Sequence, residues 1–373
     1  MRILIAPLNW GLGHASRCVP LVRRLLDEGH EVVLGGDGES LTLLRKHFPK
    51  LRYTYLAPLN LRYSVGKRQV WAMIKALPQL LLWSIKDHAM LKAVLREEPF
   101  DQVISDNRFG LYISNRRSRS NSASGLTSNS EAVYITHQLH IMLPKGWRWA
   151  EPIASRMHAR IYTRFNKVWV PDYEDPDQSL AGALSHPNYQ LPITNYQFIG
   201  PLSRFSITNH QSPGASPRRN GESGLRREGQ YTNRQSYDVV AVLSGLEPHR
   251  SLLEQDIIAR YTNDKCQMTN DKCPSVLIVQ GLMNRPNTRI KRGNITIVPS
   301  MTDAELVPAL LGAKHIIARS GYSTLMDLDA LGLLNHPSQM TNHQSPIIEL
   351  IPTPGQPEQE YLAKRIEQKT LFS

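Results

Sequence analysis

The sequence predicts an α/β protein of two Rossmann-like halves, each built on a mostly parallel sheet. Short apolar runs typical of buried strands alternate with segments that have helical periodicity. This alternation starts again in the second half, at residues 238–243 (DVVAVL). Strands that are separated by helices imply a parallel sheet covered on both faces. A length of 373 residues suits two such domains.

Individual elements follow from these patterns. A helix is expected at Ala15–Glu28, where Val19, Val22 and Leu25 recur at helical spacing. Strands are expected in the first half at Arg2–Pro7, Glu31–Gly35, Leu51–Leu56, Asp101–Ser105, Ala132–Thr136 and Lys167–Val170, and in the second half at Asp238–Leu243, Ser275–Val279, Asn294–Val298, Lys314–Ala318 and Ile347–Ile351. This order of elements predicts domains 1–200 and 237–373, joined by a linker at 201–236.

Four polar segments interrupt this order: Asn115–Ser130, Ser206–Ser236, Tyr261–Pro274 and Asn335–Pro346. The third repeats the pentapeptide TNDKC, and the second and fourth share the tetrapeptide TNHQ. They lack the apolar periodicity that would offset the entropy cost of ordering them. We therefore expect them to be surface insertions, placed where a chain tolerates added length.

The composition narrows the class of partner. A formal net charge of +12 favours acidic partners, but five of these excess charges lie in 115–131 and 205–236. Those segments have almost no aromatic residues, so nucleic acid is not an expected partner. Three cysteines and the lack of a signal peptide predict a cytoplasmic protein. Residues 71–95 mix Leu, Trp and Met with lysines, which fits either an ordinary helix core or peripheral contact at the inner face of a membrane.

The first motif follows the first strand and reads NWGLGH, residues 9–14. Gly11 and Gly13 let the backbone approach a bound group, and the helix start offers N–H donors to an anion. Ser16 occupies the third glycine position of the dinucleotide fingerprint, so that fingerprint is absent. His14 could face a phosphate or an acceptor hydroxyl. The alternative is a tight strand-to-helix turn in which His14 only packs.

Three further turns in the second half follow strands and open helices. Small residues at such a turn, with the helix dipole behind them, suit a diphosphate. The candidates for that contact are Ser320, Gly321, Ser323 and Thr324 in one turn and Ser244, Gly245 and Arg250 in another. Asp327 lies one helical turn further on and could accept hydrogen bonds from ribose hydroxyls. Gln359 and Glu360, in the third turn, could hold the hydroxyls of a sugar.

The motifs GLGH (11–14), RSGYSTLMD (319–327) and PTPGQPEQE (352–360) resemble the GT-B glycosyltransferases of the family 28 type. The best-known member of that family adds N-acetylglucosamine to the lipid-linked peptidoglycan precursor. The resemblance implies two Rossmann-like domains whose sheets face a central cleft. It also implies that Gly11, Gly13 and His14 face acceptor and diphosphate. Asp327 stands where the peptidoglycan enzyme has its ribose-binding Glu, and Gln359-Glu360 stands where it has a Gln pair.

Candidates for the general base are His14, Asp106 and His137, because the latter two directly follow predicted strands. Loop capping is the alternative for both. Neither an Asp-x-Asp motif nor a His-rich or acidic cluster at metal-ligand spacing occurs, so we expect no metal and no cofactor besides the donor. Helix termini with Arg250 or Arg319 would then stabilise the charge on the leaving diphosphate.

The expected activity is hexosyl transfer from a UDP-sugar to a glycan or lipid-linked acceptor. The sugar is expected to be a hexose or N-acetylhexosamine, transferred with inversion and without a metal. The resemblance places this activity in the synthesis of bacterial cell-envelope glycans. Two alternatives stay open: a nucleotide-sugar 2-epimerase of the same architecture, and an inactive relative disrupted by its insertions.

Overall fold

The computed structural model describes residues 1–59, 69–113, 126–189, 193, 195–206, 237–245, 247–262, 273–286, 288–334 and 346–371. The chain forms two compact units. Unit 1 comprises Met1–Leu202 and Pro354–Leu362, and unit 2 comprises Ser203–Thr353 and Ala363–Ser373. The segment Pro354–Leu362 thus belongs to unit 1, whereas the sequence parse groups it with the second half.

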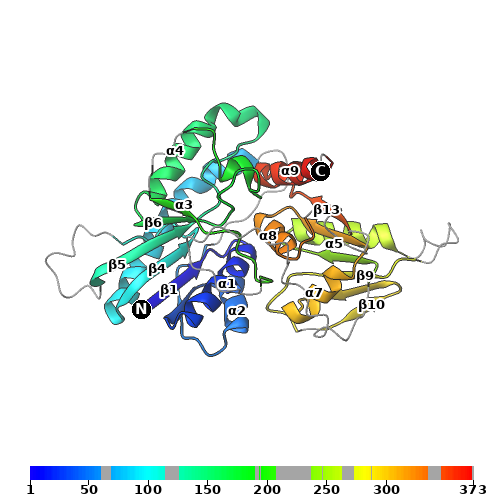
Figure 1. Ribbon diagram of the computed structural model, residues 1–373, viewed down its shortest axis with the longest axis horizontal. Coiled ribbons are helices and arrows are strands. Elements are labelled where there is room, and N and C mark those ends of the chain that lie inside the picture. Colours follow the sequence, from blue (N-terminus) through cyan, green and yellow to red (C-terminus); the bar gives the residue numbers. More distant parts are fainter. Residues whose placement is uncertain are drawn as a thin grey trace. The chain divides into compact units, whose positions relative to one another are not determined.

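Unit 1 is built on a seven-stranded sheet in the order β3-β2-β1-β4-β5-β6-β7, in which every neighbouring pair is parallel (Figure 1). The strands are β1 (Arg2–Pro7), β2 (Glu31–Gly36), β3 (Tyr53–Tyr55), β4 (Phe100–Asp106), β5 (Leu126–Ile135), β6 (Lys167–Val170) and β7 (Tyr196–Phe198). Because all of them run the same way, their carboxyl ends share one edge of the sheet, and the loops at that edge can build a common site.

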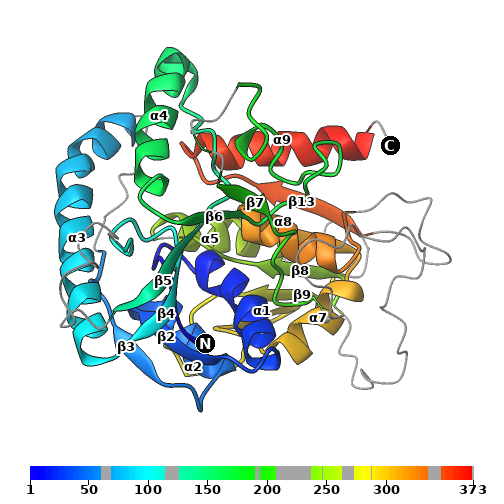
Figure 2. The same ribbon diagram turned by 60° about the vertical axis from the view of Figure 1, so that its left-hand side comes forward.

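Helices cover both faces of this sheet, and α1 and α3 lie on opposite sides of it (Figure 2). The helices are α1 (Gly13–Asp27), α2 (Gly38–His47), α3 (Gln69–Glu97), α4 (Glu151–Tyr162) and the first residues of α9 (Pro357–Leu371), with short 3-10 helices η2 (Lys145–Ala150) and η3 (Gly182–Leu184). Leu4 and Ala6 of β1 pack in one core cluster with Leu91 and Leu95 of α3. The strands are apolar on both faces, as a doubly covered sheet requires.

Unit 2 has a six-stranded sheet in the order β10-β11-β9-β8-β12-β13 (Figure 1). Its strands are β8 (Val239–Val242), β9 (Val276–Val279), β10 (Ile290–Arg292), β11 (Ile295–Val298), β12 (His315–Arg319) and β13 (Ile347–Ile351), and its helices are α5 (His249–Tyr261), α7 (Asp303–Leu311) and α8 (Tyr322–Ala330). Only β10 runs antiparallel to its neighbour within this sheet. Adjacent residues such as Val240 and Ala241 alternate between two core clusters, one on each face.

The structure corrects the sequence analysis at two insertion boundaries. Strand β5 begins at Leu126, so the end of the expected insertion Asn115–Ser130 is a strand that pairs with β4. There Ser130 donates a hydrogen bond to the Phe100 carbonyl over 2.8 Å. Likewise Tyr261 is the last residue of α5 rather than the first of an insertion. Residues 114–125, 207–236, 263–272 and 335–345 lie outside the described part of the chain.

The largest fully buried side chain, Arg108, ties three parts of unit 1 together. Its guanidinium donates to Asp37 Oδ1 over 2.8 Å, to Asp87 Oδ1 over 2.7 Å and to the Ala57 carbonyl over 2.7 Å. Burial raises the pKa of Asp87, because the charged carboxylate loses its hydration, although Arg108 acts in the opposite direction. Two buried acidic groups therefore depend on one buried cation.

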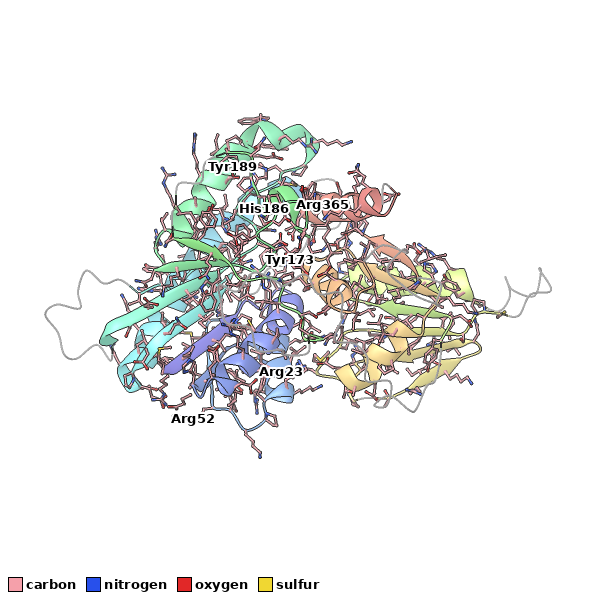
Figure 3. All side chains as sticks on the ribbon, viewed as in Figure 1. Arg23, Arg52, Tyr173, His186, Tyr189 and Arg365 are labelled. Carbon is pink, nitrogen blue, oxygen red and sulfur yellow. The ribbon has the colours of Figure 1, made fainter. Side chains whose placement is uncertain are left out.

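Replacing Arg108 with Met should destabilise unit 1 strongly. The substitution leaves Asp87 and Asp37 without their cation in a dry environment, which typically costs about 3–5 kcal/mol of unfolding free energy. The measurement is urea unfolding. The matched control is Arg52→Gln, because Arg52 pairs with Glu98 while its own side chain is 62% exposed (Figure 3). A surface pair of that kind contributes about 1 kcal/mol at most. Equal losses in the two variants would refute a stabilising role for the buried network.

Candidate functional site

A cluster of charged side chains forms at the carboxyl edge of the sheet in unit 1. Its five members are His14, Arg17, Asp106, His137 and Glu358, called the His14 cluster below. His14 and Arg17 come from the start of α1, one helical turn apart, so both face the same side. Asp106 ends β4, His137 follows β5, and Glu358 comes from the first turn of α9.

Asp106 is fully buried and is held between two partners. His14 Nδ1 lies 2.7 Å from Asp106 Oδ1, and Arg17 Nε donates to Asp106 Oδ2 over 2.5 Å. A second hydrogen bond runs from Arg17 Nη2 to Oδ1. Burial acts to raise the pKa of Asp106, but the charges of Arg17 and His14 outweigh it and hold this pKa well below the usual range. The carboxylate is therefore ionised and accepts hydrogen bonds only.

This environment determines the proton position on His14. Arg17 Nη2 also lies 3.0 Å from His14 Nδ1, but a guanidinium can only donate hydrogen bonds. The shorter 2.7 Å contact with the ionised carboxylate therefore assigns the proton to Nδ1, and the Arg17 approach is a close contact without a hydrogen bond. Nε2 then carries the lone pair, and no described residue forms a hydrogen bond with it. The side chain as a whole keeps 17% of its surface exposed.

The pKa of His14 lies below its ordinary value of 6.5. Burial is the main cause, since it disfavours the imidazolium form, and the positive charge of Arg17 acts in the same direction. Asp106 opposes both effects. A neutral imidazole with a free Nε2 is the form that can accept a proton.

His137 has both ring nitrogens occupied. Arg17 Nη1 lies 3.2 Å from Nδ1, and Nε2 lies 2.8 Å from Glu358 Oε1. Gln138 also donates to Glu358 through its side-chain amide. Burial acts to raise the pKa of Glu358, but His137, His14 and Arg17 together outweigh it and lower this pKa. His137 thus links Arg17 to the start of α9. Because both of its ring nitrogens have partners, it has no nitrogen available to act as a general base.

The loop between β1 and α1 leads directly to His14 and carries glycine at position 11. Gly11 has a φ of 76°, a conformation that other residues rarely adopt. Its carbonyl accepts a hydrogen bond from Ser40 over 3.4 Å. Gly13 is the first residue of α1, and the N-cap residue Leu12 has no side chain that could cap the helix. The first amides of α1 are therefore open to an anionic group.

Two loops of unit 2 contain the residues from which the sequence analysis expects diphosphate contacts, Ser244–Arg250 after β8 and Arg319–Thr324 after β12. They are called the donor loops below, after that expectation. Helix α5 follows Pro248 and helix α8 follows Gly321, and neither N-cap residue has a side chain that can cap. In the first turn of α5, however, the Ser251 amide donates to the Glu247 carboxylate over 3.2 Å. Gly245 has a φ of 91°, which requires glycine in practice. Ser320 is fully buried, while Ser323 and Thr324 lie in the first turn of α8. Two helix starts at one sheet edge suit a diphosphate.

The side chain of Arg319, in one donor loop, contacts the backbone of the other. It is buried and donates to the carbonyls of His249 over 2.6 Å and Pro352 over 3.1 Å. Burial lowers its pKa. Its Nε and His249 Nε2 are buried without a hydrogen-bond partner among the described residues. Arg250 donates to Glu247 and, over 3.5 Å, to the Gln280 carbonyl. Arg319 and Arg250 thus hold the loops by donating hydrogen bonds to backbone carbonyls, and they place positive charge near the loops.

The structure gives other contacts to three residues expected to bind the donor. Asp327 is buried, accepts a hydrogen bond from Ser203 over 2.6 Å and lies 3.6 Å from Arg204 Nε. Burial raises its pKa to about 6. Gln359 donates to Gln356 over 2.6 Å and Glu360 is exposed. Both belong to unit 1, whereas the donor loops belong to unit 2.

Sequence reasoning missed Arg17 and Glu358. Arg17 had a usable signal, because it lies three residues after His14 on a helix face that is otherwise apolar. Glu358 lies within the motif PTPGQPEQE (352–360), but its pairing with His137, 221 residues away in sequence, had no local signal.

Among the described residues, no group of three or more His, Cys, Asp or Glu side chains could hold a metal ion. No helix in this part of the chain is both long and apolar enough to span a bilayer.

Comparisons with known proteins agree with this architecture. The chain is 28% identical over 222 residues to a protein of Methanosarcina acetivorans described as an uncharacterized glycosyltransferase; the match covers 55% of this chain and 50% of that relative, about half its length. No protein-family model matches the chain. Among solved structures, the spinosyn forosaminyltransferase SpnP aligns with a TM-score of 0.51 at 15% identity, covering 98% of this chain and 84% of that one. The calicheamicin glycosyltransferase CalG4 aligns with a TM-score of 0.50 at 13% identity, covering 100% and 94%. The chain has the GT-B fold.

The pKa of His14 provides a test of the cluster's electrostatics. A histidine NMR titration should place it below 6.5 in the intact protein, because burial disfavours the charged ring. Asp106→Asn should lower it further, since the substitution removes the negative charge that favours the imidazolium. A His14 pKa above 6.5, or an upward shift in the variant, would contradict this account.

Proposed function

We propose that this chain is a glycosyltransferase in which His14, oriented by Asp106, is the general base. The observation that carries the proposal is the 2.7 Å contact between His14 Nδ1 and Asp106 Oδ1, which leaves Nε2 without a partner among the described residues. The GT-B fold and the description of the curated relative support the same activity.

The reaction would proceed as a single displacement. His14 Nε2 takes the proton from an acceptor hydroxyl as the acceptor oxygen attacks the anomeric carbon of the donor. The bond from that carbon to the diphosphate breaks, and its electron pair leaves with the nucleoside diphosphate. Attack from the face opposite the leaving group inverts the anomeric centre. Asp106 holds the ring in the required tautomer and stabilises the imidazolium that forms.

The proposed donor is a UDP-sugar carrying a hexose or N-acetylhexosamine, with its diphosphate on the donor loops of unit 2. The start of α8 has no side-chain cap and supplies N–H donors, whereas at the start of α5 the Ser251 amide already donates to Glu247 and only the amides before it would be offered. Arg319 and Arg250 supply positive charge for the leaving group. These residues offset the diphosphate charge without a metal in this proposal. The ribose would replace Ser203 on Asp327, while Gln359 and Glu360 are the proposed contacts for sugar hydroxyls.

The proposed acceptor is a glycan or lipid-linked molecule of the cell envelope, reached at the inner face of the membrane. The support is an exposed apolar stripe on α3. Leu81 and Ile85 are each 66% exposed and lie one turn apart, beside Leu82 at 62%. Lysines on the same helix, Lys86 and Lys92, add positive charge that anionic headgroups attract. The 2-epimerase alternative is not favoured, because the curated relative is described as a glycosyltransferase.

Replacing His14 with Ala should lower turnover by about 100- to 10,000-fold while UDP affinity stays unchanged, because a general base acts on the chemical step. The assay is UDP release from labelled UDP-sugars with acceptor extract, combined with UDP titration. His30→Ala is the matched control, since His30 precedes β2 at the opposite edge of the sheet. Turnover of the His14 variant within about threefold of the parent would rule out the base. Weakened UDP binding would instead assign His14 to the phosphate.

Replacing His249 with Phe should weaken UDP binding by about tenfold, because the ring is kept while a buried donor near the diphosphate is lost. The measurement is calorimetric titration with UDP, with and without EDTA. His315→Phe is the control, since His315 begins β12 at the edge away from the donor loops. Unchanged affinity in the His249 variant, or binding abolished by EDTA, would count against the proposed donor site.

A further inference from the structure

Unit 1 contains a cavity of about 450 Å³ beside α4, apart from the His14 cluster. Its walls come from the segment after β5, from η2, from both ends of α4 and from the loop that carries Tyr189. Tyr189 is labelled in Figure 3. The lining residues are Leu139, His140, Arg148, Glu151, Pro152, Ser155, Arg156, Tyr162, Asn188 and Tyr189. Four of these residues are apolar or aromatic, and the other six are polar or charged.

The charge on the cavity wall is predominantly positive. Glu151, its one acidic residue, is already engaged, because it lies 3.3 Å from His140 Nε2 and accepts a hydrogen bond from the Leu143 amide over 3.0 Å. No described residue provides an acidic partner for Arg148 or Arg156. Both arginines therefore present uncompensated guanidinium groups, and a guanidinium matches the geometry of a phosphate or carboxylate.

Tyr162 supplies a second, independent observation. Its side chain is fully buried, and its hydroxyl has no hydrogen-bond partner among the described residues. Burial raises the pKa of this hydroxyl, and the nearby Tyr189 hydroxyl acts in the same direction. Tyr189 OH in turn lies 3.3 Å from His140 Nδ1, and all three residues line the cavity. A buried hydroxyl without a partner is costly unless a ligand or water completes it.

The cavity also has a short connection to the proposed catalytic residues. Leu139 and His140 come two and three residues after His137, and their amides both bond the Leu184 carbonyl, over 2.8 Å and 2.9 Å. Gln138, between them and His137, contacts Glu358. A molecule in the cavity therefore lies against the same short segment that contributes His137 to the His14 cluster.

We propose that this cavity binds a phosphate ester group of the acceptor, through the two guanidinium groups of Arg148 and Arg156 and the hydroxyl of Tyr162. The assignment to the acceptor rests on the proposed function, but binding of the phosphate ester does not. Exposed apolar side chains on the same segment, Trp149 at 70% and Ile153 and Met157 at 53%, suit an acceptor with an apolar portion. The phosphate ester could belong to a lipid headgroup or to a free phosphorylated molecule, and both share this chemistry.

The test uses the full chain and two probes that carry the same phosphomonoester. One is glycerol 3-phosphate, measured by titration calorimetry. The other is phosphatidic acid in phosphatidylcholine vesicles, measured by cosedimentation against vesicles of phosphatidylcholine alone. The variants are Arg148→Gln with Arg156→Gln, which alters exposed side chains, and Tyr162→Phe, which keeps the ring. The matched control is Arg160→Gln, an exposed arginine on α4 outside the cavity lining.

The double arginine variant should weaken probe binding by about tenfold or more, and Tyr162→Phe by about threefold to tenfold, as the loss of charge-assisted and neutral hydrogen bonds implies. Arg160→Gln should stay within about twofold of the parent. Binding of the soluble probe supports a free phosphorylated acceptor, and binding of the vesicles alone supports a lipid headgroup. Lack of binding to both probes, or equal weakening in the Arg160 variant, would overturn the proposal. Because no donor or turnover is needed, this result is independent of whether the chain proves to be a glycosyltransferase.

Discussion

The buried negative charge of Asp106 is the constraint on which the candidate site depends. A carboxylate removed from water must be paired, and its pairing requires Arg17 beside it and His14 against its other side. Arg17 in turn contacts His137, and His137 holds Glu358 at the start of α9. One charge therefore determines the tautomer of His14, orients this proposed base and ties the C-terminal segment Pro354–Leu362 into unit 1.

In unit 2 the buried charge is a cation, and its partners are backbone carbonyls. Its buried cation, Arg319, binds backbone carbonyls from the loops after β8 and β13 instead of a carboxylate. Its charge is thus not cancelled by an acidic group in these contacts, and its own loop leads into α8, whose start favours an anion. In both units the parallel sheet makes this possible, because it gathers the loops that follow the strands at one edge.

Sequence patterns predicted the elements whose stability comes from local apolar repetition. The bounds of β1, β6 and β13 agree with expectation, because each strand is a short apolar run within a parallel sheet. Strands β7 and β10 were missed, since both are short and largely exposed at a sheet edge. Long-range pairing was also beyond reach: neither the contact of Glu358 with His137 nor that of Asp327 with Ser203 has a local signature. The candidate base could be located from the sequence, but its partners could not be assigned.

The central claim is that His14 and Asp106 act as one unit on the acceptor proton. A double-mutant cycle on turnover, with His14→Ala, Asp106→Asn and the combined variant, tests it most directly, using donor-saturated rates per folded protein. If Asp106 acts through His14, the asparagine substitution lowers turnover in the parent but has little further effect once His14 is absent. Rate losses that multiply in the combined variant would show that the two residues act independently and would contradict the account.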